Sequence, residues 1–127
     1  MQTMILWALV AFYLLTGLII SVAPEFFYAT GPGVAATGPY NMHFLRDVGF
    51  AFTLSALGLA YGLRYEIKPL VLFGASWLVV HGIFHFVLWL LHDQPGSSNA
   101  LLDVALVVLP AAVLAYLAIS YKPGSAD

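Results

Sequence analysis

The run that decides the fold is PLVLFGASWLVVHGIFHFVLWLL, residues 69–91. It contains no Asp, Glu, Lys or Arg. As a helix rising 1.5 Å per residue, it is long enough to cross about 30 Å of hydrocarbon. Three further apolar runs of comparable length cover residues 4–22, 42–64 and 100–121, and none shows the two-residue alternation of a barrel strand. Because a helix satisfies its backbone hydrogen bonds internally, we predict an all-α, polytopic membrane protein, an antiparallel bundle of four transmembrane helices.

The composition limits what such a chain can be. With 62% hydrophobic and 8% charged residues among 127, it is too apolar for a soluble domain of this size, so residues 1–127 are expected to form one transmembrane domain in a lipid bilayer. Cysteine is absent, which excludes thiolate nucleophiles, disulfides and cysteine-ligated metals. The formal net charge of −2 provides no basic patch, so nucleic acid is not an expected partner.

The breaks between the runs indicate how the helices connect. Residues 64–68 are too few for anything but a short turn, so the second and third helices should be antiparallel neighbours. Asn41 is a candidate N-cap, and Pro110 should kink the last helix because it removes a backbone hydrogen bond. We expect residues 4–22 to be a membrane span and not a cleaved signal, since no Lys or Arg precedes this long run.

The basic residues predict an orientation. Arg64, Lys68 and Lys122 fall on one side of a four-helix topology, and the loops on the other side contain no Lys or Arg. The positive-inside rule then places both termini in the cytoplasm. Gly58 and Gly62 form a GxxxG pair that would allow close approach of a neighbouring helix, either within the chain or in a homo-oligomer or larger membrane complex.

Ionisable residues gather at the predicted outer end of the bundle, although each costs at least about 2.5 to 3.5 kcal/mol inside a span. Because a helix turns about 100° per residue, three histidines fall on one narrow stripe of the third predicted helix. A His/Asp pair four residues apart shares one face of the second predicted helix. These five candidate metal ligands are His43, Asp47, His81, His85 and His92. A supporting polar network is expected from Asn41, Arg46, Asp103 and Glu25.

Two contacts follow from this arrangement. Arg46 and Asp47 are adjacent and about 100° apart, so each should find its partner on another helix. We expect Arg46 near Asp103 or Glu25, and Asp47 near His85 or His92. A neutral His81 hydrogen-bonded across a helix interface, and an ion-pair network that is purely structural, remain open alternatives.

The opening N-x-H-x-x-R-D-x-G at residues 41–49 and the H-x-x-x-H at residues 81–85 resemble small, uncharacterised four-helix membrane proteins of bacteria. The layout is similar to that of the DoxX-like group. The resemblance implies a bacterial inner-membrane protein of about this length and brings no established activity with it. It also implies that the two motifs contribute to one site.

Three functions compete. The first is a periplasm-facing site for Zn, Cu or Fe, with His43, Asp47, His85 and either His81 or His92 as ligands, in a metal-handling protein or a metal-dependent membrane enzyme. The second is a noncatalytic accessory subunit or assembly partner, in which the polar cluster locks the helices together. The third is b-type haem with histidine axial ligands, which ranks below a bare metal because histidines at matched depth are few. Whether chemistry occurs, and whether a lipid or quinone binds, are left open.

Overall fold

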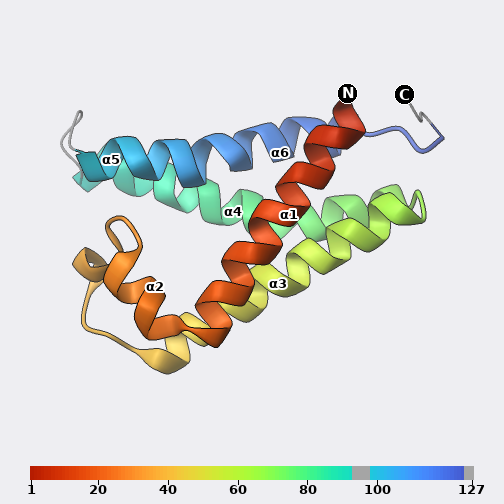
Figure 1. Cartoon of the computed structure of the whole chain (residues 1–127). Coiled ribbons are helices and arrows are strands. Elements are labelled where there is room, and N and C mark those ends of the chain that lie inside the picture. The colour runs from red at the N-terminus through yellow and green to blue at the C-terminus, as the bar shows by residue number, and fades with distance from the viewer. Residues whose placement is uncertain (93–97, 125–127) are drawn as a thin grey trace.

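The computed structural model describes residues 1–92 and 98–124, and this part of the chain is helical and contains no strand. Four helices are long and apolar enough to cross a membrane, which confirms the all-α prediction with four candidate spans. They are α1 (Gln2–Val22), α3 (Met42–Arg64), α4 (Lys68–His92) and a composite last helix made of α5 (Ser98–Asp103), a π-helical turn η2 (Val104–Val108) and α6 (Leu109–Ser120). Figure 1 shows their arrangement.

The segment between α1 and α3 is more ordered than the irregular loop that its glycines and prolines suggested. It contains α2 (Pro24–Thr30) and the short 3-10 helix η1 (Val34–Thr37). Pro24 begins α2, where the missing N–H costs nothing. The Tyr28 hydroxyl donates a hydrogen bond to the Gly38 carbonyl at 3.0 Å, which ties the end of this segment back to α2.

Neighbouring helices meet where small residues let their backbones approach. α1 packs on α3 at Gly17 and Gly49, because a Cβ on Gly17 would lie 2.7 Å from the backbone of Thr53. α3 packs on α4 around Gly62, where a Cβ would lie 2.6 Å from the Val71 nitrogen. Small residues at helix crossings of this kind are common in bundles of membrane helices. The GxxxG pair therefore lies against α4 of the same chain.

α4 in turn packs against the last helix, and α1 also touches α6. A Cβ on Gly82 would collide with the Cβ of Ala111, so these two residues mark the closest approach of α4 and α6. The buried core lies between the four long helices, and its fully buried large side chains are Leu6, Ile20, Leu59, Val71, Leu78 and Leu114.

Side chains join the ends of the helices near the two termini. The Gln2 amide Nε2 donates to the Leu117 carbonyl and to the Ser120 hydroxyl, both at 3.0 Å, which holds the start of α1 on the end of α6. The Lys68 ammonium donates to the Ile119 carbonyl at 2.9 Å, so a cation caps the C-terminal end of α6. In Figure 1 the start of α1 and the end of α6 lie at this end of the molecule.

At the opposite end, the pair formed by α1 and α3 diverges from the pair formed by α4 and α5 (Figure 1). Gly17 and Gly49 hold α1 on α3, and Gly82 holds α4 on α6, the continuation of the helix that begins as α5. His43, Arg46 and Asp47 lie in the first turns of α3 at this diverging end, and His85 lies in the half of α4 that leads to the same end, so these parts of α3 and α4 are held apart.

Candidate functional site

Two histidines of α4 form the centre of the site. His81 and His85 are one helical turn apart and lie on the same face, with ring centroids 4.5 Å apart and ring planes inclined by 53°. This is the pairing that the i, i+4 spacing predicted. Both side chains are partly buried. Two imidazoles are thereby brought side by side in a largely apolar helix.

The carboxylate beside them comes from the last helix. The Nδ1 atom of His85 lies 2.8 Å from one carboxylate oxygen of Asp103 and 2.9 Å from the other. An ionised carboxylate can only accept, so the imidazole donates through Nδ1–H and the proton of its neutral form sits there. The two side chains are only 24% and 22% exposed. The bond therefore orients the ring and leaves Nε2 as the nitrogen with a free lone pair.

Aromatic rings hold His81 in place. The Phe52 ring of α3 meets it edge-on at 5.0 Å between centroids, and the Trp77 ring of α4 stacks with it at 6.0 Å. The described contacts of His81 are thus with rings, including that of His85. A side chain clamped in this way has few rotamers left, so its ring nitrogens keep a constant direction.

The predicted partners from α3 do not reach this pair. His43 and Asp47 are exposed and Arg46 is partly buried, and none of the three forms a hydrogen bond or ion pair with another residue of the described ranges. Within residues 1–92 and 98–124 there is no group of three or more His, Asp or Glu side chains placed to hold a metal ion. A site that combines His43 and Asp47 with His85 is therefore not assembled.

Two expected contacts are not formed among the described residues. The carboxylate at His85 is Asp103 and not Asp47, and Arg46 forms no ion pair with Asp103 or Glu25. The other partner expected for Asp47, His92, has its side chain outside the described residues. The physical reason is the divergence at this end: α3 stays on α1 through Gly17 and Gly49, whereas its close contacts with α4, at Gly62 and Gly74, lie toward the other end. Asp103 reaches His85 because its helix lies directly against α4 at this depth.

The remaining predicted residues have separate positions. The Asn41 side-chain oxygen accepts a hydrogen bond from the Phe44 N–H at 3.1 Å, so Asn41 caps α3 as predicted and its amide is engaged in the helix start. Glu25 is exposed on α2. His92 is the last residue of α4, and its side chain lies outside the described residues.

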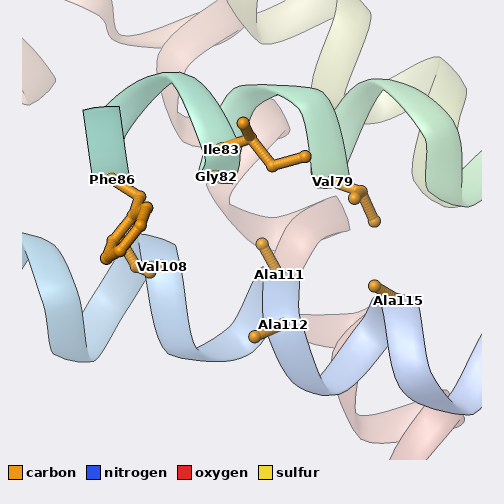
Figure 2. A pocket seen from close by; sticks show the side chains of 8 residues that line it. All are labelled: Val79, Gly82, Ile83, Phe86, Val108, Ala111, Ala112 and Ala115. Atoms are coloured by element: carbon orange, nitrogen blue, oxygen red, sulfur yellow. The ribbon is translucent and has the colours of Figure 1, made fainter. Parts of the chain in front are cut away.

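A second feature, the α4–α6 groove, lies on another face of α4. It has a volume of about 330 Å³, and Figure 2 shows the apolar side chains around it. Its lining residues are Val79, Gly82, Ile83, Phe86, Val108, Ala111, Ala112 and Ala115. At about 100° per residue these α4 positions lie roughly 60° to 160° around the helix from His85. The groove therefore opens away from the histidines, and its lining has no polar side chain to orient a ligand.

Sequence reasoning missed one element of the site, the π turn that directly follows Asp103. Pro110 could have indicated the π turn, because a helix must change its hydrogen bonding around a proline. We predicted a kink at Pro110 instead. π turns are rare and occur often at functional sites.

The chain was compared with protein-family models, with curated proteins and with solved structures, and none of the three comparisons finds a match.

Proposed function

We propose that this chain is a multi-pass protein of the bacterial inner membrane, an antiparallel bundle with both termini in the cytoplasm. Large apolar side chains on the outer faces of the helices support a lipid environment, among them Phe73 at 76% and Ile119 at 68% exposed. Arg64, Lys68 and Lys122 at one end support the orientation through the positive-inside rule. The histidine site then lies toward the periplasm.

Within that topology, we propose that His81 and His85 bind a transition-metal ion through their imidazoles. The observation that carries the proposal is the bond from His85 Nδ1–H to the Asp103 carboxylate. Metal-ligating histidines commonly donate their other ring nitrogen to a carboxylate, which fixes the tautomer and raises the basicity of the ligating nitrogen. Asp103 would serve in this way, and His85 would offer Nε2 to the ion.

The donor set favours particular ions. Neutral imidazole suits Zn, Cu, Fe and Ni better than Mg or Ca. Two protein ligands leave positions for water or another small ligand, which is typical of an exchangeable or reactive site and not of a closed structural one. Bis-histidine haem is less favoured, because His81 and His85 lie on one face of one helix and cannot approach opposite faces of a porphyrin.

The test is metal binding by the purified protein in detergent. Zn²⁺ and Cu²⁺ are titrated into metal-free wild-type protein, and elemental analysis and a visible spectrum are recorded on protein purified without added metal. We expect binding of about one ion per chain that is lost in His81→Ala and in His85→Ala. Asp103→Asn should weaken binding by about 10- to 100-fold, the usual effect of removing a carboxylate behind a ligating histidine.

His43→Ala is the matched control, because it removes an exposed imidazole on α3. It should bind metal as wild type does. Loss of binding in His43→Ala would show that α3 contributes a ligand, and equal binding by His85→Ala would exclude the α4 site. A wild-type protein that binds neither ion contradicts the proposal and directs attention to a role as an accessory subunit.

A further inference from the structure

The further inference concerns what aims Asp103 at His85. Asp103 ends α5, and the next five residues, Val104–Val108, form one π-helical turn. At the end of this turn the Leu109 N–H donates to the Val104 carbonyl, five residues back instead of the four of an α-helix. The turn therefore contains one residue more than a regular α-helix would place there.

That extra residue changes the direction of Asp103. Ala111 marks the side of α6 that meets α4, through its contact with Gly82. In an unbroken α-helix, Asp103 would lie eight residues before Ala111 and about 80° away around the axis. The π turn takes up one extra residue. Asp103 therefore points in the direction that the seventh residue before Ala111 would have in a regular α-helix, which is about 20° from Ala111 around the axis. The π turn thus rotates Asp103 onto the side of the helix that faces α4.

Pro110 accounts for the π turn. Proline lacks an N–H, and its ring collides with the carbonyl four residues earlier, which here is that of Leu106. Leu106 lies inside the π turn, where the widened helix moves this carbonyl away from the ring. We propose that Pro110 is a positioning residue: by holding the π turn, it directs the Asp103 carboxylate to His85 Nδ1. This assignment rests on the proposed metal site for its purpose, but its geometry can be tested without any metal.

The chain has no cysteine, so pairs of introduced cysteines can report the register directly. His85→Cys is combined with Asp103→Cys in one variant and with Val104→Cys in another, each with and without Pro110→Ala. A short bifunctional thiol reagent is added in detergent, and the yield of intramolecular crosslink is measured by mass spectrometry. With Pro110 present, the pair 85/103 should crosslink more than the pair 85/104. In the Pro110→Ala background the ratio should invert, because Val104 takes over the direction that Asp103 had.

Two controls keep this test decisive. Pro69→Ala removes a proline from the first turn of α4, where proline is tolerated, and should leave the ratio unchanged. Gln2→Cys with Ser120→Cys, whose native side chains are in contact, should crosslink equally with and without Pro110→Ala and so shows that the last helix stays packed. A ratio unaffected by Pro110→Ala, with the 2/120 crosslink intact, overturns the inference.

Metal binding provides an independent readout. Exchanging the two residues, Asp103→Val with Val104→Asp, should lower metal affinity by about 10- to 100-fold, as loss of the carboxylate does. Adding Pro110→Ala to this exchange should restore it. Failure of the rescue while the crosslink ratio inverts would contradict the metal role of Asp103 and leave the register assignment standing, whereas an unchanged ratio contradicts the register itself.

Discussion

Tyr13 contains a buried oxygen that does not form a hydrogen bond with any of the described residues. The side chain is 3% exposed in the middle of α1, and its ring packs on Phe12 and Phe52. A hydroxyl buried without a partner costs free energy relative to the same ring without it. The aromatic ring is thus the part of Tyr13 that stabilises the fold, and the oxygen opposes it.

Replacing Tyr13 by Phe should therefore stabilise the protein by about 1 kcal/mol, because it removes the unpaired hydroxyl and keeps the ring. The measurement is thermal unfolding in detergent. Tyr61→Phe, at a side chain that is 54% exposed, should change nothing and controls for the loss of a phenol. A destabilised Tyr13→Phe protein would mean that a bound water or ligand satisfies the hydroxyl.

The crossing of α3 and α4 depends on how near two backbones can come. A Cβ on Gly74 would collide with the Leu59 backbone, whereas one on Gly58 would meet the Gly74 Cα at an ordinary 3.6 Å. The two glycines thus face the same crossing but tolerate a methyl group very differently. Farther along α3, the Phe52 ring contacts that of His81 at 5.0 Å between centroids.

Gly74→Ala should accordingly destabilise the protein by about 1–3 kcal/mol, since it forces α3 and α4 apart. Gly58→Ala is the matched control and should be neutral or slightly stabilising, because alanine favours a helix over glycine. Both are measured by thermal unfolding in detergent. Equal destabilisation by the two variants would show that the crossing is looser than the structure has it.

At the scale of the whole molecule, three of the four basic residues, Arg64, Lys68 and Lys122, lie at one end. Arg64 and Lys68 lie at the turn between α3 and α4, the end where the start of α1 meets the end of α6, and the His–Asp pair lies toward the other end. Two exposed residues can report on the two ends separately. Ile67 lies at the turn between α3 and α4, and Ala36 lies in η1, in the segment that connects α1 to α3 at the other end. The proposed orientation gives them different accessibility in a cell.

Single cysteines introduced as Ala36→Cys and Ile67→Cys should respond differently to a membrane-impermeant maleimide. In cells with a permeabilised outer membrane, Ala36→Cys should be labelled, and Ile67→Cys only after the inner membrane is also opened. The cysteine-free wild type is the background control. The reverse pattern would invert the topology and place the histidine site toward the cytoplasm.

Several features followed from local sequence because they depend on neighbours along the chain. Apolar runs of this length form helices to satisfy their own backbone in an apolar medium. Asn41 caps α3 through its own side chain, and His81 and His85 share a face because a helix turns about 100° per residue. Four candidate spans, one cap and the histidine pair were predictable on these grounds.

The partner of that histidine pair depended on tertiary structure. Asp47 and Asp103 are both carboxylates near the same end of long helices, and nothing in their local sequence ranks one above the other as the residue beside His85. The choice follows from where the helices pack together: the glycine contacts of α3 with α4, at Gly62 and Gly74, lie far from Asp47, while Gly82 brings α4 against the last helix one turn from His85. It also follows from the π turn, which rotates Asp103 toward α4. Helix formation is local and readable from sequence, whereas the contact between His85 and Asp103 requires the packing and rotation of whole helices.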